Sequence, residues 1–178
     1  MTTKEIKHNL AILEASRWIG VTEQGGNNKG QIVQMFQKTI DGVASAEAWC
    51  MAFVQSVVRN SEKYFDVVMP DKIEESALKL FASEHCLTVW SKTDSKCRVK
   101  TPSPGSIVIW QHGNSTNGHT GIVLEVDVKN KTMTTIEGNT GTEDDTVVRE
   151  GDGVYKRKRS MVANGDMKVV GFLNAWGS

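Results

Sequence analysis

The hydrophobic pattern of this chain changes its period once, near Gly105, and this change limits the folds that the chain can adopt. Before that point, apolar residues recur three or four positions apart, which is the spacing of one face of an α-helix. After it, short β-branched segments are separated by Gly, Asn and Asp, which is typical of strands joined by turns. Helices followed by an antiparallel sheet indicate the α+β class, with N-terminal helices packed on a C-terminal sheet.

The expected elements follow from these periods and from the residues that interrupt them. We expect helices over 3–19, over 32–40, from Ser45 onward and over 71–84. We expect strands over 106–111, 119–127, 132–137, 146–149, 154–159 and 168–174. The sequence has 178 residues and shows no internal repeat or linker, so we expect a single domain over 1–178.

Composition excludes several classes of function. The chain has 21 basic and 21 acidic side chains, so its formal net charge is zero and it lacks the positive field of a nucleic-acid-binding protein. No apolar run approaches the ~20 residues that cross a bilayer, so no membrane partner is expected. Residues 1–12 lack the apolar segment of a signal peptide. We therefore expect a protein made in the cytoplasm, acting as a monomer.

Cys50 lies near the start of the third expected helix. Ser45 has the side chain of a helix N-cap, and helical spacing relates Cys50, Phe53, Val54, Val57 and Val58. A cysteine on such a stripe is usually a small core residue. At a helix N-terminus beside a cationic group, however, the pKa of a thiol falls below its usual ~8.5, and the backbone amides there can stabilise an oxyanion.

His119 begins one expected strand and Glu137 ends the next. Each alone would be an ordinary strand-end residue, but the order thiol, imidazole, acid along the chain is that of papain-like cysteine hydrolases. In such a site Cys50 attacks an amide carbonyl, the imidazole transfers the proton, and the acid holds the imidazole in its useful tautomer. Asn139 is a second orienting group, a contact to substrate, or simply a turn former.

This hypothesis requires His119 and Glu137 to lie on the same face of two paired strands. A three-residue loop, 129–131, would pair the residues that flank it and place Glu137 opposite Val123, on the face of His119. A loop with an even number of residues would move the acid to the opposite face. Gly121, on the face of His119, would leave room for a helix end to approach the imidazole.

Four short motifs resemble those of the CHAP family, the cysteine, histidine-dependent amidohydrolases and peptidases: Trp49-Cys50, Pro104-Gly105-Ser106-Ile107-Val108, Gly118-His119-Thr120-Gly121 and Glu137-Gly138-Asn139. Segment 19–28 resembles the lead-in of small bacterial and phage members, and segment 147–155 also resembles family members. As a whole, the chain resembles the phage-endolysin type of the family. The resemblance implies a papain-like fold. It also implies a role for each matched residue: nucleophile for Cys50, base for His119, third catalytic residue for Glu137 and accessory for Asn139.

The chain departs from the family pattern at two positions. Ser106 stands where the family usually has Asp, and Met51 where it usually has Ala. Neither change touches a catalytic atom, so both bear on substrate preference. Some members bind calcium through an Asp-rich loop before the nucleophile, but here that stretch offers only Asp41, and we expect no metal and no cofactor. His112, upstream of His119, fits no common zinc spacing.

The resemblance implies a substrate, bacterial peptidoglycan. The bond cut would be the amide of N-acetylmuramoyl-L-alanine or one within the peptide stem or cross-bridge. Without a signal peptide, the protein would reach the wall as a phage lysin or a delivered effector, and would be bacteriolytic. Two alternatives are a thiol amidase or transferase acting on a small amide, and an inactive CHAP-like binding module. The intact Cys50, His119 and Glu137 argue against the inactive module.

Five residues are expected near the substrate: Trp49, Trp110, Gly118, Glu23 and Asn27. The tryptophans are candidates because aromatic faces bind glycans and peptides, although core packing explains them equally well. Glu23 and Asn27 are candidates by the resemblance alone.

Two other features have alternative interpretations. Cys86 and Cys97 either pair with each other or remain thiols together with Cys50, and the missing export signal favours thiols. The basic run 156–159 resembles a nuclear-localisation tract. On a strand its side chains alternate between two faces, which favours a solvated sheet edge.

Overall fold

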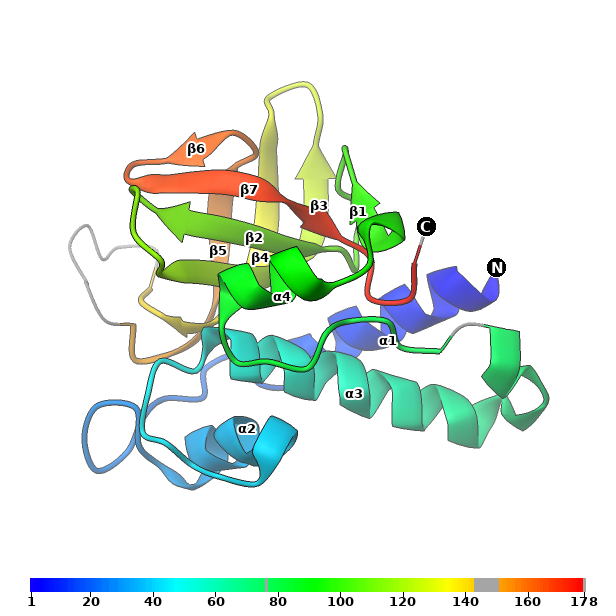
Figure 1. The fold of residues 1–178 in the computed structure, drawn as a ribbon, viewed down its shortest axis with the longest axis horizontal. Coiled ribbons are helices and arrows are strands. Elements are labelled where there is room, and N and C mark those ends of the chain that lie inside the picture. The colour runs from blue at the N-terminus through cyan, green and yellow to red at the C-terminus, as the bar shows by residue number, and fades with distance from the viewer. Residues whose placement is uncertain (76, 143–150, 178) are drawn as a thin grey trace.

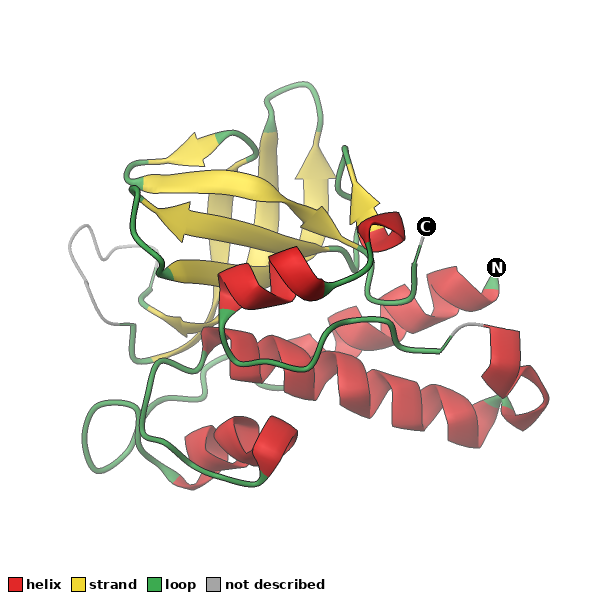
Figure 2. Cartoon of the chain, in the orientation of Figure 1, coloured by secondary structure: helices red, strands yellow, loops and turns green. Residues whose placement is uncertain are grey.

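The computed structural model describes residues 1–75, 77–142 and 151–177. Its helices are α1 (Thr3–Ser16), α2 (Gln31–Asp41), α3 (Cys50–Val68) and α4 (Cys86–Lys92), with 3-10 helices η1 (Pro70–Glu75) and η2 (Ser95–Cys97). Its strands are β1 (Arg98–Val99), β2 (Ile107–His112), β3 (Gly118–Asp127), β4 (Thr132–Thr140), β5 (Gly153–Ser160), β6 (Ala163–Asn164) and β7 (Met167–Leu173). Figures 1 and 2 show α1, α2 and α3 stacked on one side of a curved sheet, so the expected α+β class is confirmed.

The described strands form one antiparallel sheet in the order β1-β7-β2-β3-β4-β5, and β6 pairs with β7. The expected strands 106–111, 119–127, 132–137, 154–159 and 168–174 are confirmed to within three residues at each end. β1 and β6 were not expected, and 146–149 lies outside the described residues. In the part of the chain that the structure describes, no helix combines the length and apolarity needed to cross a membrane.

The sheet is apolar on both faces because each face covers a separate core. One face packs on the helices through Ile107, Ile109, Ile122, Ile136 and Val154. The other face holds a smaller cluster of Val108, Trp110, Val123, Met133 and Phe172. Helix α3 lies between the sheet and the other helices, so most of its first half is buried, including Phe53, Val54, Val57 and Val58. Burying side chains of this size contributes about 1.5–3 kcal/mol each, which fixes α3 against β3 and β4.

Two helix expectations are wrong. Helix α3 begins at Cys50 itself, with Trp49 as its N-cap, so Ser45 is not the cap. The expected helix over 71–84 is reduced to η1, and 77–83 has no regular structure. Its backbone groups bind other parts of the fold instead: the Phe81 amide donates to Thr93 Oγ1 (3.0 Å), and the Phe81 carbonyl accepts from Gln55 Nε2 (2.7 Å). These tertiary hydrogen bonds replace the helical ladder.

The pairing of β3 with β4 decides where the acid points. The loop between them has four residues, 128–131, because Asp127 pairs with Thr132. The expected three-residue loop is therefore wrong, and an even loop alone would turn Glu137 away from His119. A β-bulge at Leu124 adds one unpaired residue to β3. Glu125 pairs with Thr134 on one side of the bulge and Val123 pairs with Thr135 on the other, so the pairing changes by one residue across it. The bulge returns the base and the acid to the same face.

Candidate active site

The nucleophile candidate occupies the first position of α3. The amide of Cys50 has no intrahelical carbonyl to donate to at this end of the helix, and Cys50 is only 6% exposed. Trp49 fixes this end: its indole Nε1 donates to Glu23 Oε1 (2.8 Å) and its ring stacks on Phe36 with centroids 5.7 Å apart. The other Glu23 oxygen accepts the Asn28 amide (2.8 Å). The loop before α2 is thereby tied to the start of α3.

His119 and Glu137 meet across β3 and β4. His119 Nε2 lies 2.8 Å from Glu137 Oε2, and the carboxylate is fully buried. A hydrogen bond at Nε2 fixes the ring orientation and leaves Nδ1 for the thiol. Burial lowers the pKa of His119, but its contacts with Cys50 and Glu137 outweigh this and raise it to about 9. At neutral pH the ring is therefore an imidazolium.

Glu137 has partners that the sequence did not reveal. Arg159 binds both carboxylate oxygens, with Nε to Oε1 at 2.8 Å and Nη2 to Oε2 at 2.5 Å. Thr135 Oγ1 also donates to Oε1, at 2.5 Å. Burial raises the pKa of Glu137, but the hydrogen bonds from Arg159 and His119 outweigh it and hold the pKa well below its ordinary value. The carboxylate is thus a fixed anion that accepts from three side chains.

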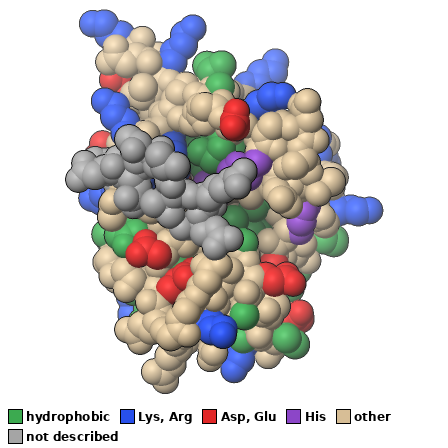
Figure 3. Space-filling view, turned by 90° about the vertical axis from the view of Figure 1, so that its left-hand side faces the viewer, with side chains coloured by type: hydrophobic (Ala, Val, Ile, Leu, Met, Phe, Trp, Pro, Cys, Tyr) green, Lys and Arg blue, Asp and Glu red, His purple; other side chains and the backbone are tan. Residues whose placement is uncertain are grey.

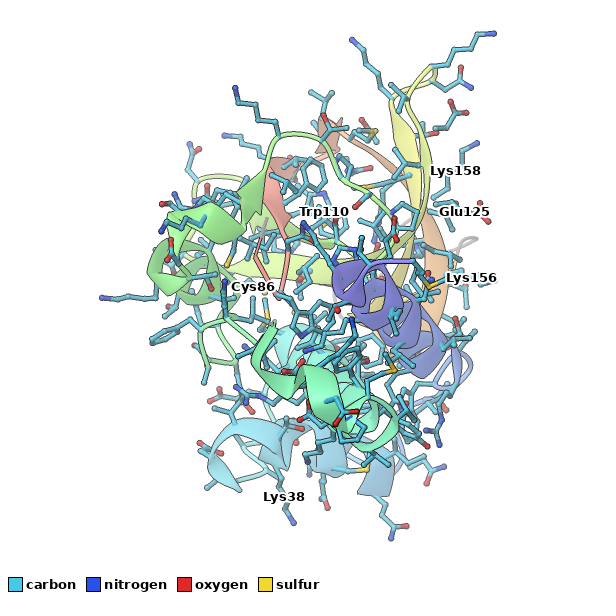
Figure 4. The ribbon with its side chains drawn as sticks, turned by 90° about the vertical axis from the view of Figure 1, so that its right-hand side faces the viewer. Lys38, Cys86, Trp110, Glu125, Lys156 and Lys158 are labelled. Atoms are coloured by element: carbon cyan, nitrogen blue, oxygen red, sulfur yellow. The ribbon has the colours of Figure 1, made fainter. Side chains whose placement is uncertain are left out.

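Arg159 belongs to the basic run at 156–159. Among the described strands the expected edge position is confirmed, because β5 ends their order. Lys156 and Lys158 are exposed and point outward in Figure 4, on the same side of the molecule as Glu125. Arg159 lies on the other face, where its side chain is 12% exposed, so its expected solvation is wrong. The alternation along β5 separates the two kinds of residue.

Trp110 lies beneath the imidazole. Its ring stacks on His119 with centroids 5.6 Å apart and an interplanar angle of 21°, and the Arg159 guanidinium lies 5.7 Å from the same ring. Neither Trp110 nor Trp49 has exposed surface. The expectation that they present aromatic faces to a substrate is therefore wrong for this structure. Trp110 instead packs against His119, and Trp49 packs against Phe36 beside the start of α3.

Two glycines make room for different neighbours. A Cβ on Gly121 would lie 2.7 Å from Glu137 Cγ, so this glycine admits the carboxylate and not, as expected, a helix end. A Cβ on Gly138 would lie 2.7 Å from Phe53 Cβ, so Gly138 is where α3 approaches the sheet. In Glu137-Gly138 the first residue thus serves the site and the second serves the helix.

Asn139 has a positive φ of 53°, which suits its alternative role as a turn former. Its Oδ1 is buried, and among the described residues it accepts no hydrogen bond. Among the described residues no hydrogen bond joins the Asn139 side-chain oxygen to His119 or Glu137, so its accessory role stays a prediction. Gly118, next to His119, is partly exposed, and Asn27 is exposed in the loop before α2.

The thiol has a neighbour that was not expected. Cys50 Sγ lies 3.7 Å from Cys86 Sγ, and all three cysteines are free thiols. The Cys86 hydrogen bond and the contact with His119 outweigh burial and lower the pKa of Cys50 well below its ordinary value. Together with the raised pKa of His119, this favours a thiolate–imidazolium pair. Figure 3 shows histidine side chains at two separate places on one face of the molecule, one of them beside hydrophobic side chains.

The His112 ring centroid lies 6.4 Å from that of His119. Within the described residues, no group of three or more His, Cys, Asp or Glu side chains is placed to hold a metal ion. The expectation that no metal takes part stays a prediction.

A comparison with protein families gives one match, the CHAP domain, over residues 42–139. The matched span is more than half of the chain and contains Cys50, His119, Glu137 and Asn139. Glu23 and Arg159 lie outside it. No curated protein matches the chain.

Proposed function

Because the chain belongs to the CHAP family, whose members are mostly cysteine amidohydrolases and peptidases acting on peptidoglycan, we propose that it hydrolyses an amide bond of the bacterial cell wall through Cys50, His119 and Glu137. The observation that carries the proposal is the 2.8 Å contact between His119 Nε2 and the buried Glu137, together with the contact of the same imidazole with the Cys50 thiol. The bond is that of N-acetylmuramoyl-L-alanine or one in the peptide stem or cross-bridge.

Acylation starts from the thiolate–imidazolium pair. The Cys50 sulfur attacks the amide carbonyl carbon, and the carbonyl electron pair moves to oxygen. Backbone amides at the start of α3 have no intrahelical acceptor, so they can donate to this oxyanion. The His119 imidazolium then gives its proton to the leaving amine as the carbon–nitrogen bond breaks, which leaves an acyl-enzyme and a neutral imidazole.

Deacylation reverses the direction of proton transfer. The neutral His119 removes a proton from water, which attacks the thioester carbonyl and expels the Cys50 sulfur as thiolate. Glu137 supports both steps because its position on Nε2 keeps the ring in one orientation and stabilises the imidazolium each time it forms. Arg159 acts through Glu137 as a positioning residue, and Gly118 and Asn139 remain candidates for contact with the substrate.

The test follows the turbidity of purified cell-wall suspensions with the wild-type chain and with Cys50→Ala. We expect clearing with the wild type and none with the variant, whose fold is checked by circular dichroism. Mass analysis of the soluble products names the bond, because an amidase releases peptides with a free L-alanine amino group and an endopeptidase releases disaccharide-linked fragments. Clearing by both proteins, or by neither, would contradict the proposal.

We further propose that the protein is bacteriolytic, as an endolysin is. This role predicts that added protein lyses cells whose wall is accessible, and that Cys50→Ala does not. If walls stay intact while small amides are hydrolysed, the thiol amidase or transferase alternative holds. Binding to walls without hydrolysis would indicate an inactive binding module.

A further inference from the structure

Cys86 is the cysteine for which the proposed reaction supplies no covalent role, yet its sulfur lies against the nucleophile. The two Sγ atoms are 3.7 Å apart, in contact but not bonded. Cys86 is the first residue of α4 and Cys50 the first residue of α3, so the two thiols approach from different helices. Both are nearly enclosed, with 4% and 6% of their surfaces exposed.

Two features hold the thiols together. Gln55, on α3 just after the nucleophile, donates to the carbonyls of Phe81 (2.7 Å) and Ser83 (3.3 Å), which ties the segment before Cys86 to α3. On the opposite side, a Cβ on Gly118 would lie 3.0 Å from Cys86 Cβ, so the absence of a side chain there lets Cys86 pack against β3. The contact between the sulfurs is therefore built into the tertiary structure.

We infer that Cys50 and Cys86 form a reversible disulfide when the protein meets a hydroperoxide, with Cys50 as the reacting thiol and Cys86 as the resolving thiol. A disulfide has a sulfur–sulfur distance of ~2.05 Å, so the two atoms need to approach by about 1.7 Å. Residues 77–83, which lead into Cys86, have no regular structure, and the Gln55 hydrogen bonds keep this segment beside α3 while the sulfurs approach. Cys97 is fully buried and takes no part.

The oxidation proceeds in two balanced steps. The Cys50 thiolate attacks one peroxide oxygen, a sulfur–oxygen bond forms, the oxygen–oxygen bond breaks, and the second oxygen leaves as hydroxide and takes up a proton. The Cys86 sulfur then attacks the Cys50 sulfenic acid, the sulfur–sulfur bond forms, and the hydroxyl leaves as water with the Cys86 proton. Two thiols are oxidised and one peroxide is reduced to water. A dithiol reverses the reaction by exchange.

The disulfide would remove the nucleophile, and this consequence rests on the proposed hydrolase function. It would also protect Cys50, because a sulfenic acid that meets a thiol at once is not oxidised further to the irreversible sulfinic acid. Oxidised protein would be inactive but recoverable, and reduced protein active. The bond itself can be detected without any hydrolysis assay.

The test treats the reduced full-length chain with hydrogen peroxide, blocks remaining thiols with N-ethylmaleimide, and measures intact mass and tryptic peptides. We expect free thiols to fall from the three of the sequence to one, with peptide 39–59 linked to peptide 80–92. Hydrolytic activity should be lost and then restored by dithiothreitol. Cys97→Ala is the matched control and should behave as the wild type does.

Cys86→Ala removes the resolving thiol, and Cys86→Ser serves if the alanine variant does not fold. The activity of each oxidised variant is compared with that of the same variant in reduced form, so a difference in basal activity between variants does not affect the comparison. We expect Cys50 to gain two or three oxygen atoms and dithiothreitol to restore nothing. The inference is overturned if peroxide also converts wild-type Cys50 to sulfinic acid, or if Cys97 appears in the linked peptide. It is likewise overturned if dithiothreitol fully restores the activity of peroxide-treated Cys86→Ala. If the reduced protein shows no hydrolysis, the proposed function fails, but the peptide map still shows whether the Cys50–Cys86 disulfide forms.

Discussion

Two ion pairs in this molecule have similar components, but one carboxylate is partly exposed and the other is fully buried. Near the N-terminus, Lys7 Nζ lies 2.8 Å from Glu62, which also accepts the Trp176 indole at 2.5 Å. In the sheet, Glu137 binds Arg159 and also His119. The first carboxylate joins α1, α3 and the C-terminal segment. The second holds a ring that faces a thiol.

The difference shows what turns a carboxylate in an ion pair from a structural element into part of a reaction. Both pairs cost desolvation energy, and both recover it through several hydrogen bonds. Among the described contacts, the partners of Glu62 are the Lys7 ammonium and the Trp176 indole, which donate hydrogen bonds and take no part in the proposed proton transfer. Among the partners of Glu137, one is an imidazole whose proton is exchanged during the proposed reaction. Removing Glu62 should therefore lower the stability and leave the activity unchanged, whereas removing Glu137 should lower the activity.

The largest effect is expected from Glu137→Gln compared with Glu62→Gln. We expect Glu137→Gln to lower kcat/KM by about 10²–10⁴-fold, because the amide neither stabilises the imidazolium nor fixes the tautomer. Glu62→Gln should leave kcat/KM unchanged but lower the free energy of unfolding by about 1.5–3 kcal/mol, since a neutral amide is a weaker acceptor than a carboxylate for the buried Lys7 ammonium. Urea unfolding and hydrolysis rates measure the two quantities. Loss of activity in both variants, with intact folds, would remove the distinction.

Arg159 is expected to give the next largest effect. Arg159→Lys keeps the charge but loses the fork that binds both oxygens of Glu137, so we expect kcat/KM to fall about tenfold with little change in KM. The matched control is Lys158→Met, one residue away on the exposed face of β5, which should be neutral. If Arg159→Lys were as active as the wild type over the whole pH range, Arg159 would be only a structural partner.

The sequence indicated which side chains form the candidate site better than it indicated their environment. Cys50, His119 and Glu137 were identified because their order and strand context are visible in one dimension. The bulge at Leu124 was not visible, because it depends on how two strands pair, and it is what aims the acid. Arg159 was hidden in a basic run whose two faces differ only once β5 is placed beside β4.

The helix expectations failed for a related reason. Apolar spacing over 71–84 favours a helix, yet tertiary hydrogen bonds from Gln55 and Thr93 bind the backbone of Phe81 instead. The same contacts bring Cys86 to Cys50, which no spacing along the chain could indicate. Local pattern thus predicted elements and chemistry, whereas contacts between distant segments decided the surroundings of the site.

The pH dependence of kcat/KM should also distinguish the two ion pairs, because only one of them contacts His119. The pKa of His119 is raised from its usual 6.5 to about 9, so the stability it contributes is complete below pH 6.5 and is lost as the pH rises through 9. Acylation also needs the imidazolium, so we expect kcat/KM to fall above pH 9. Glu137→Gln should move this alkaline limb to lower pH, and Glu62→Gln should leave it in place. An alkaline limb that does not move in Glu137→Gln would mean that His119 is not the group observed.

The smallest effect is expected at Glu23, a third carboxylate, which adjoins the site but touches no reacting atom. Its two oxygens bind the Trp49 indole and the Asn28 amide, and through Trp49 it holds the start of α3. Glu23→Gln keeps one acceptor oxygen, so one of the two hydrogen bonds is lost, at a cost of about 1 kcal/mol in unfolding free energy. If Glu23 only stabilises the fold, as Glu62 does, kcat/KM should not change. We expect instead a decrease of about threefold to tenfold, larger in Glu23→Ala, because a shift of the Cys50 sulfur weakens attack even in a folded protein. Equal activity in wild type, Glu23→Gln and Glu23→Ala would place Glu23 with Glu62, on the structural side of the comparison.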